Sequence, residues 1–594
     1  MIRTPFLKLP MVCIGLFFIT TASFSEIVHA VSGNKLFRVA SQTTPQRNDI
    51  VISELMADPT PAIGLPELEW VELHNTSNTA INLLGWRVGD ARTVSGPMPN
   101  FILQPDSMVL VCASSSATAL STFARVVAVT SFPSLDNDGD VLFIRSAQGN
   151  IIHAVEYTAD WYQNDMKANG GWSLEMIDVY NPCSGISNWI ASSSLIGATP
   201  GKINAATRIL SDRQAPQLLR AFAVDSLTIH LVFNEPLDSA RSIALQNFNV
   251  DNGIGQPIKV NVIPPIFSRV QLKLSTPLQR NKIYRLQCSG VADCVGNSVA
   301  ATQSVKVGLS SFASRGDVIV NEILFNPPAN GTDYVELYNK SNHIINLSTL
   351  SIANRNTVGN ISSIEPLTNE PMLLFPESFV LLAESFQWIK QTYSIFDSTT
   401  FVSTTLPTLS DDKGNVLLLN EQGTIIDELN YTQAWHFPFI QNEEGVALER
   451  INYFAPTQAP ENWHSASTTV QHGTPGYQNS QHRINDNFEG TMKWSTPVLT
   501  PDNDGVDDFG LLQYVLPEAG YVAAINIYDQ MGRVVKVLQQ AALCGREGSF
   551  RWDGIGEKGQ KLKTGIYIIY VELFKVNGKR KSFKIPIVLA TSKQ

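Results

Sequence analysis

Three aspartates near the C-terminus form the pattern in this sequence that most resembles a metal-binding loop. Asp502, Asp504 and Asp508 lie in the segment DNDGVDD, with Gly505 between them. Carboxylate oxygens are the ligands that Ca²⁺ prefers, and a glycine lets such a loop bend tightly. The loop lacks the distal glutamate of an EF-hand, so an acidic turn without an ion is the alternative. The sequence therefore predicts calcium as the candidate cofactor, held by these three aspartates.

Residues that could carry out catalysis do not gather in a recognisable motif. The nine histidines form no HExxH zinc motif, and the sequence has no G-x-S-x-G nucleophile elbow and no P-loop. Glu54 and Glu72 have counterparts in Glu322 and Glu336, which raises the hypothesis of a carboxylate acid/base pair. We favour the interpretation that these carboxylates sit at alternate strand positions and satisfy loop amides. We therefore predict no catalytic residues and no enzymatic activity.

The six cysteines indicate disulfides formed in an oxidising compartment. Cys288 and Cys294 flank a short glycine-containing turn, so we predict a local disulfide between them, with two reduced thiols as the alternative. Cys112 and Cys183 belong to the same predicted domain and form a second candidate pair. Cys544 would then stay unpaired. No cysteine and histidine spacing suits structural zinc.

The first thirty residues have the pattern of an export signal. A positively charged start precedes the apolar run Met11 to Ala22, and Val28-His29-Ala30 offers a cleavage site. We therefore predict a signal peptide over residues 1–30, whose removal would also remove Cys13. No other segment reaches the ~18 apolar residues of a membrane-spanning helix, so we expect no transmembrane span in the mature chain.

Composition constrains the rest of the architecture. At 594 residues the chain has room for roughly four domains of ~150 residues. Charged residues make up only 16%, while 38 Gly and 32 Pro supply the turns that many short strands require. The formal net charge of -10 has the wrong sign for a phosphate-binding surface. These features predict β-rich modules and no nucleic-acid partner.

Two long segments of the chain repeat each other. Glu54 recurs as Glu322, an offset of 322 − 54 = 268, and Glu72 recurs as Glu336, an offset of 336 − 72 = 264. Later motifs follow in the same order: Asn188-Trp189 returns as Asn462-Trp463, and Thr199-Pro200-Gly201 as Thr474-Pro475-Gly476. Offsets that drift by a few residues describe one fold used twice, with insertions in loops. Alternating apolar and polar runs between turn residues predict that each copy is a β-sandwich.

These repeated motifs resemble the lamin-tail domain. The resemblance rests on VISELMADP, WVELHNTSNTAINLLGW and ATPG in the first copy, and on VIVNEILFNP, YVELYNKSNHIINLSTL and GTPG in the second. It implies immunoglobulin-like β-sandwiches at residues 48–207 and 316–481, of a kind attached to many secreted bacterial proteins and thought to mediate attachment. Leu350 stands where the first copy has Trp86, so the second copy must replace a core aromatic residue.

Two further segments resemble other bacterial modules. Residues 213–308 contain alternating strands and the turn DCVGN, and resemble a bacterial Ig-like domain. Residues 487–594 contain TPDNDGVDD, IYDQMGRVV and WDG, and are similar to type IX secretion and gliding-motility-associated C-terminal domains. That resemblance implies a sorting address that the secretion machinery reads. The expected fold class is all-β, with four tandem Ig-like β-sandwich modules after the signal peptide.

Three functions fit this organisation. We favour a non-catalytic exported protein, at the cell surface or outer membrane or released outside, that serves attachment or envelope architecture; its protein or glycan ligand is not identified by the sequence. The second is a calcium-dependent glycan or matrix binder, which would expose its tryptophans. The third is a hydrolase with an unrecognised active site. Contacts are expected in loops that differ between the copies, such as Asp58 to Leu68 and Asn326 to Thr332.

Overall fold

The computed structural model describes residues 44–395, 400–482 and 490–590. The predicted signal peptide at residues 1–30 lies outside them. Over the described residues the protein is all-β, and its α-helices are the short segments α1 (Ala117–Leu120) and α2 (Gln387–Thr392). The chain forms two compact units. The first comprises Met1–Pro182 and Trp189–Ile209, and the second Cys183–Asn188 and Leu210–Gln594.

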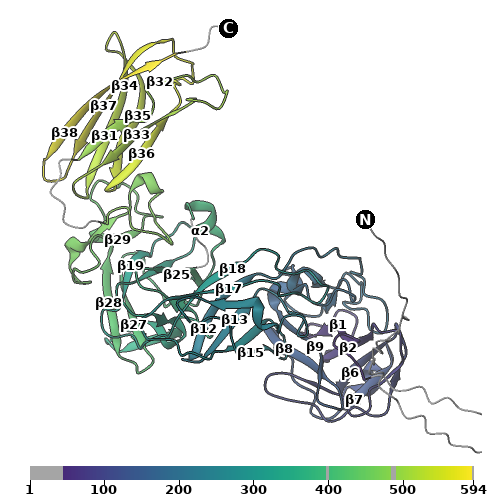
Figure 1. Cartoon of the computed structure of the whole chain (residues 1–594). Helices are drawn as coiled ribbons and strands as arrows, with labels where there is room; N and C mark the ends of the chain where they lie inside the picture. The colour runs from purple at the N-terminus through teal and green to yellow at the C-terminus, as the bar shows by residue number, and fades with distance from the viewer. Residues whose placement is uncertain (1–43, 396–399, 483–489, 591–594) are drawn as a thin grey trace, which may run out of the picture. The chain divides into compact units, whose positions relative to one another are not determined.

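The first unit contains the first sandwich, the earlier of the two repeated copies (Figure 1). Its large sheet has the order β11-β10-β1-β2-β6-β7, its small sheet the order β4-β8-β9, and β3 pairs with β5. Residues from both sheets, including Val71 of β2, Val88 of β4 and Trp189 of β11, share one buried cluster with Trp86. The strands are β1 (Ile50–Met56), β2 (Trp70–Asn75), β3 (Ile81–Asn82), β4 (Arg87–Gly89), β5 (Ile102–Leu103), β6 (Met108–Ala113), β7 (Val126–Val129), β8 (Gly139–Arg145), β9 (Ile151–Thr158), β10 (Leu174–Met176) and β11 (Trp189–Ala191).

The second sandwich, in the second unit, repeats this topology. Its large sheet has the order β26-β25-β20-β19-β29-β30, its small sheet the order β23-β22-β27-β28, and β21 pairs with β24. Leu350 is buried in its core, as Trp86 is in the first sandwich. The strands are β19 (Val318–Leu324), β20 (Tyr334–Asn339), β21 (Ile345–Asn346), β22 (Leu350–Arg355), β23 (Ile361–Pro366), β24 (Leu373–Leu374), β25 (Phe379–Ala383), β26 (Phe401–Ser403), β27 (Lys413–Asn420), β28 (Ile425–Thr432), β29 (Leu448–Arg450) and β30 (Trp463–Ser465).

The middle module precedes the second sandwich in the chain. It pairs the sheet β12-β13-β16-β15 with the sheet β14-β17-β18 around its own buried cluster. Alternation of buried and outward residues along strands such as Tyr284–Cys288 is what places one face of each sheet in that cluster. The strands are β12 (Leu218–Asp225), β13 (Thr228–Phe233), β14 (Phe248–Val250), β15 (Lys259–Ile263), β16 (Arg269–Lys273), β17 (Tyr284–Cys288) and β18 (Gln303–Val307).

The C-terminal module is built from two sheets whose strands pair antiparallel, except for the parallel pair β32 and β38. A sheet of order β31-β33-β36 and a sheet of order β32-β38-β37-β34-β35 share a core that includes Trp552 and Ile569. The domain boundaries given above from the sequence remain a prediction. The strands are β31 (Thr491–Trp494), β32 (Val498–Leu499), β33 (Gly510–Val515), β34 (Tyr521–Asp529), β35 (Val534–Cys544), β36 (Glu547–Trp552), β37 (Gly565–Phe574) and β38 (Arg580–Leu589).

The cysteine pairing differs from the sequence prediction. The structure joins Cys183 to Cys294, with 6.0 Å between their Cα atoms, and leaves Cys112, Cys288 and Cys544 as buried free thiols. Both predicted pairs, Cys288–Cys294 and Cys112–Cys183, are therefore wrong. Cys288 points into the core of the middle module as the last residue of β17, whereas Cys294 lies in the turn that follows. Alternation along a strand, rather than distance along the chain, decides which thiol can be bridged.

Candidate functional site

The repeated glutamates lie side by side on neighbouring strands. In the first sandwich Glu54 on β1 is the register partner of both Glu72 on β2 and Glu175 on β10. A β-bulge at Ser53 adjusts the spacing at this point. All three side chains are fully buried. Like charges directly opposite on paired strands repel each other, so this glutamate row requires compensating hydrogen bonds.

Backbone amides from the end of the sandwich supply those hydrogen bonds. Thr199 N donates to Glu54 Oε1 at 2.8 Å, Gly201 N to Glu72 Oε2 at 2.6 Å, and Ala206 N to Glu175 Oε2 at 2.8 Å. We call residues 199–206 the first closing segment. Hydroxyl groups donate to the other oxygens: Thr199 Oγ1 to Glu54 Oε2, Ser53 Oγ to Glu72 Oε1 and Ser192 Oγ to Glu175 Oε1. The glutamate row therefore binds the first closing segment to the large sheet.

The second sandwich repeats the row with Glu322 on β19, Glu336 on β20 and Glu449 on β29. Their backbone donors come from residues 474–481, the second closing segment. Thr474 N donates to Glu322 Oε1 at 2.9 Å, Gly476 N to Glu336 Oε2 and Gln481 N to Glu449 Oε2 at 2.8 Å. The side-chain amide of Asn479 donates to the backbone carbonyls of Asn321 and Arg450. Its counterpart Asn204 donates in the same way to the carbonyls of Ser53 and Met176. These bonds confirm the interpretation that the repeated carboxylates satisfy loop amides.

Burial controls the ionisation of the rows. Desolvation and the neighbouring carboxylate Glu72 raise the pKa of Glu54 well above its ordinary value. Desolvation raises the pKa of Glu72 to about 7, against the hydrogen bonds that favour its charged form. In the second row, desolvation and then repulsion by Glu322 raise the pKa of Glu336 well above its ordinary value and that of Glu449 to about 8. Near neutral pH each row therefore shares fewer than three negative charges.

Sequence reasoning found two glutamates of each row and missed the third. Glu175 and Glu449 lie in the short motifs SLEM and ALER, which are separated by the same offset as the tryptophans after them, 449 − 175 = 274 and 463 − 189 = 274. That constant offset was the available signal. The motif is short because the strands β10 and β29 each have only three residues.

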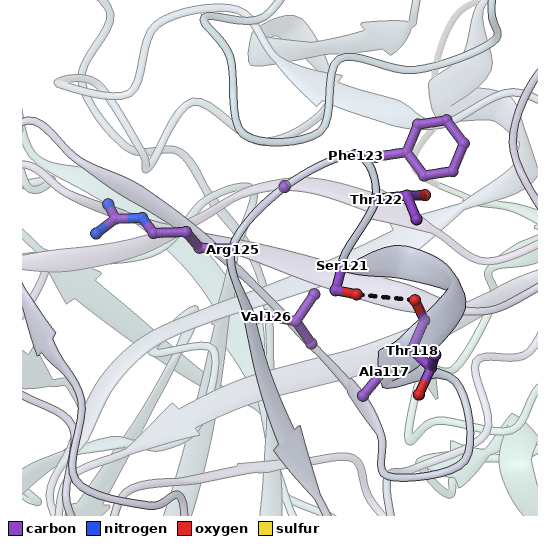
Figure 2. Close-up of a pocket in the computed structure, with 8 residues that line it drawn as sticks. Ala117, Thr118, Ser121, Thr122, Phe123, Arg125 and Val126 are labelled. Atoms are coloured by element: carbon purple, nitrogen blue, oxygen red, sulfur yellow. Dashed lines mark hydrogen bonds between the residues drawn. The ribbon is translucent and has the colours of Figure 1, made fainter.

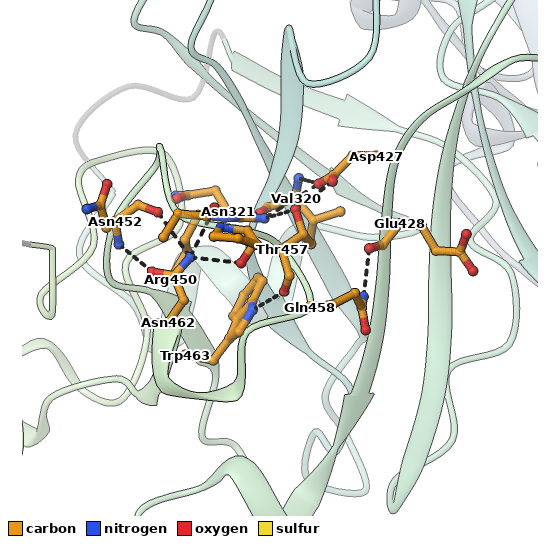
Figure 3. A network of polar contacts seen from close by, with 12 residues as sticks. Val320, Asn321, Asp427, Glu428, Arg450, Asn452, Thr457, Gln458, Asn462 and Trp463 are labelled. Carbon is orange, nitrogen blue, oxygen red and sulfur yellow. Dashed lines mark hydrogen bonds and ion pairs between the residues drawn. The ribbon is translucent and has the colours of Figure 1, made fainter.

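A buried arginine, Arg450, follows Glu449 on β29 and is the centre of a polar network (Figure 3). Arg450 is fully buried and donates from Nε to Val320 O at 2.7 Å and from Nη2 to Thr457 Oγ1 at 2.9 Å. Asp427 lies 3.5 Å from Nη2, and the Trp463 ring lies 5.0 Å from the guanidinium carbon. Burial lowers the pKa of Arg450 to about 10, opposed by the attraction of Asp427.

The first sandwich fills the equivalent positions with uncharged groups. Met176 corresponds to Arg450 and His153 to Asp427, both at an offset of 274 (450 − 176 and 427 − 153). Ile52 N donates to His153 Nδ1 at 3.2 Å, as Val320 N donates to Asp427 Oδ2 at 2.9 Å. His153 and Asp427 thus each accept the backbone N–H that precedes the β-bulge. Burial lowers the pKa of His153 to about 3, which keeps Nδ1 available as an acceptor.

The three aspartates predicted to bind calcium do come together. The carboxylates of Asp502, Asp504 and Asp508 each place an oxygen within 4.8 Å of the others. Backbone amides already use several of these oxygens. Gly505 N donates to Asp508 Oδ2 and Val506 N to Asp504 Oδ1, both at 2.8 Å. The geometry is compatible with a bound ion and with the acidic turn, so calcium remains a prediction.

A second acidic cluster was not predicted. Asp212, Glu235 and Asp293 also approach within 4.8 Å. Asp293 accepts three backbone N–H groups of the DCVGN turn, and Asp212 accepts from Ser184 Oγ at 3.0 Å. Desolvation and the nearby Asp293 raise the pKa of Glu235 to about 7. The cluster includes Asp293, the residue before the bridged Cys294, and the Asp293 carboxylate organises the turn.

A surface depression beside α1 and the tryptophan side chains are two further features to compare with the sequence predictions. Among the described residues, an open depression of about 550 Å³ lies beside α1, lined by residues 117, 118 and 121–126 (Figure 2). Ser121 Oγ and Thr122 Oγ1 donate to carbonyls of that helix, and Arg125 and Phe123 point away from each other. The tryptophans considered for glycan stacking are buried or half-buried: Trp86, Trp161, Trp172, Trp189, Trp435 and Trp463.

Family comparisons identify the repeated modules. Residues 43–159 and 311–433 match the Lamin Tail Domain, and residues 502–575 match the FlgD Ig-like domain. The two lamin tail domains expected from the sequence are thereby confirmed. The matched segments end before the closing segments that the glutamate rows hold. No curated protein matches the chain.

Several solved structures are similar to parts of the chain at low TM-scores. The N-terminal part of the bacterial S-layer protein SbsC is 16% identical over 37% of this chain and 44% of that chain, with a TM-score of 0.15. A tetra-tandem repeat from the extending region of a large adhesion protein is 9% identical over 91% and 98%, with a TM-score of 0.12. A DUF4876 family protein from Bacteroides thetaiotaomicron is 13% identical over 35% and 83%, with a TM-score of 0.17. The chain thus spans less than half of the S-layer protein chain.

Over the described residues, we find no helix with the length and apolarity needed to cross a membrane.

Proposed function

We propose that this chain, with its two lamin tail domains, is a non-catalytic exported protein that serves attachment or envelope architecture at the cell surface. The supporting observation is that the buried glutamates, the residues best suited to acid/base catalysis, are fully hydrogen-bonded within the fold. Each of the six row glutamates has both carboxylate oxygens engaged by hydroxyl, amide or backbone donors of its own sandwich. A general base needs a free oxygen that faces substrate.

Attachment in this proposal uses the loops rather than the sheets. The framework of the two sandwiches is the same, whereas the loop Asp58 to Leu68 is longer than its counterpart Asn326 to Thr332. Residues 60–64 of the longer loop are exposed. Rigid sheets that carry divergent loops give two contact surfaces from one fold.

The C-terminal module is proposed to act as the sorting or anchoring address, read by the secretion machinery. Deletion of residues 487–594 is the test, followed by fractionation of cells into periplasm, outer membrane and medium. The truncated chain should accumulate in the periplasm, while a full-length Asp504→Ala variant serves as a control that keeps the module. Normal surface amounts of the truncated chain would contradict this role.

A calcium-dependent glycan or matrix binder is the second candidate, favoured only by the approach of Asp502, Asp504 and Asp508. It requires glycan or matrix binding that EDTA abolishes. The enzymatic alternative is tested by screening the mature chain against phosphodiester, peptide and glycoside substrates. Turnover that disappears on substitution of one or two carboxylates would overturn the non-catalytic proposal.

A further inference from the structure

The C-terminal module carries apolar residues on the outer face of its large sheet. Inward residues such as Ile569 and Val571 of β37 belong to the core, and the alternate residues point outward. The outward face of an antiparallel sheet is normally polar when it meets water. At one end of this sheet the outward residues are instead apolar. We define the outer patch as Val498, Tyr528, Val534, Ile566, Ile568, Pro586 and Val588.

Strand register makes the outer patch continuous. In one row Val498 lies opposite Val588, which lies opposite Ile566. In the next row Pro586 lies opposite Ile568, Ile568 opposite Tyr528, and Tyr528 opposite Val534. Ile566 is 56% exposed, Val534 49%, Val588 40% and Ile568 38%. The two adjacent rows cover three and four strands and together reach all five strands of the sheet. They form one contiguous apolar surface that is open to water, a candidate for an interaction surface.

The other end of the same face is already an interface. Val522 of β34, Leu543 of β35 and Phe574 of β37 form a cluster with Phe437 and Ile440 of the second sandwich. Phe439 of the second sandwich also lies 6.2 Å from Phe574, measured between ring centroids. This face thus docks a β-sandwich at one end and continues into the outer patch at the other.

Charge on the face is separated from the outer patch. Lys584 lies one row beyond it, opposite Tyr570, and Arg580 lies at the far end, opposite Phe574. Over residues 487–594, fourteen Lys and Arg exceed eleven Asp and Glu, a net +3, so the rest of the chain carries -13. An acidic foreign partner would be drawn to the basic end rather than to the outer patch.

We propose that the outer patch is the interface between two copies of this chain, related by a two-fold axis. A two-fold axis through the patch brings the apolar rows of both copies together and points the two basic ends in opposite directions. The two sheets have the same twist, so they can pack face to face at about 30°. A two-fold interface uses the same surface on both partners, and the outer patch is such a self-matching surface.

The size of the outer patch sets the expected strength. With strands ~4.8 Å apart and ~6.7 Å between rows, the seven positions of the outer patch cover about 220 Å² on each copy. A standard stable interface covers about 800 Å² on each partner. The dimer should therefore be weak, with a dissociation constant on the order of 10 to 100 µM. Its driving force is apolar burial, so it should persist at high salt.

The test uses the mature full-length chain in sedimentation velocity from 1 to 200 µM. The wild type should shift from monomer to dimer over this range, and Ile568→Lys should weaken dimerisation at least tenfold. Ser582→Lys places the same charge on the same face outside the outer patch, so it should dimerise like the wild type. Unchanged melting temperatures of both variants establish that the module is folded.

Cross-linking provides a second measurement that does not depend on a disruptive charge. Ile568→Cys should form a disulfide-linked dimer under mild oxidation, and Ser582→Cys should not. A wild type that stays monomeric to 200 µM would overturn the proposal, as would equal dimerisation of Ile568→Lys. Loss of the dimer at 1 M NaCl would indicate a contact made by charges, and would also overturn it.

Discussion

Replacement of Arg450 by Met should destabilise the second sandwich strongly, although Met occupies the same place in the first. The change leaves Asp427 nearly buried without its cation. It also removes donors from Val320 O and from Thr457 Oγ1. Removal of one partner of a buried ion pair typically costs about 3–5 kcal/mol. We expect a loss in this range.

The double variant Arg450→Met with Asp427→His should recover much of that loss. It recreates the pair Met176 and His153, in which a neutral imidazole accepts the backbone N–H that precedes the β-bulge. The double variant should therefore be more stable than either single variant by at least about 2 kcal/mol, since contacting residues couple by up to ~3 kcal/mol.

Hydrogen exchange measured by mass spectrometry in the full chain is the suitable assay, because it resolves local stability where a multidomain chain does not unfold in two states. Peptides that cover β28 and β29 report on the second sandwich, and peptides that cover β9 and β10 are the internal control. The reasoning fails if Arg450→Met keeps wild-type protection within about 0.5 kcal/mol. It also fails if the double variant is as unstable as the worse single variant.

Four further expectations concern ionisation, metal and disulfide chemistry. Burial lowers the pKa of His153 to about 3 in the fold, so the unfolded chain binds the proton first as the pH falls. The stability of the first sandwich should therefore fall by up to ~1.4 kcal/mol per pH unit as the pH drops from 6.5 towards 3. Hydrogen exchange should detect this loss, and His153→Asn should remove it. The pKa of Glu449 is raised to about 8, so its contribution to stability is complete below about pH 4.5 and is lost as the pH rises through 8. Hydrogen exchange of the second closing segment should therefore accelerate from pH 5 to 9 by more than the intrinsic exchange rate does. An unchanged protection factor would contradict this. Millimolar Ca²⁺ should raise the melting temperature of the C-terminal module in the wild type but not in Asp504→Ala, and no shift in the wild type would leave the acidic turn. Non-reducing mass spectrometry should recover a peptide that links Cys183 to Cys294, and free alkylation of both thiols in the purified chain would reject it.

The β-sandwich fold and its duplication were predictable because they follow from local patterns. Alternating polarity, turn residues and matched motifs identified β1 and β19 together with Glu54 and Glu322. The structural role of the glutamates was also predictable, since buried carboxylates need hydrogen-bond donors and the loops supply backbone N–H groups. The third member of each row was missed because β10 and β29 have only three residues each, which leaves the constant offset of 274 as the one signal in the sequence.

The disulfide was not predictable from chain proximity. Cys288 and Cys294 are six positions apart, but a strand and a turn point them in different directions. Cys183 is 111 residues from Cys294 and meets it only through the tertiary fold. Likewise, the exchange of Met176 and His153 for Arg450 and Asp427 looks like two unrelated changes in the sequence. Only the fold shows that His153 and Asp427 accept the same backbone N–H in the two copies.

The closing segments have a consequence for how such proteins change over time and how they can be redesigned. Each glutamate row binds backbone N–H groups, which every residue except proline provides, so the positions between the anchored threonine, glycine and asparagine are not fixed by side-chain bonds to the row. Lys202-Ile203 in one copy and Tyr477-Gln478 in the other occupy corresponding places beside the same anchored glycine. The end of each sandwich is thus a natural grafting position, where new recognition sequences can be written without altering the core that holds them.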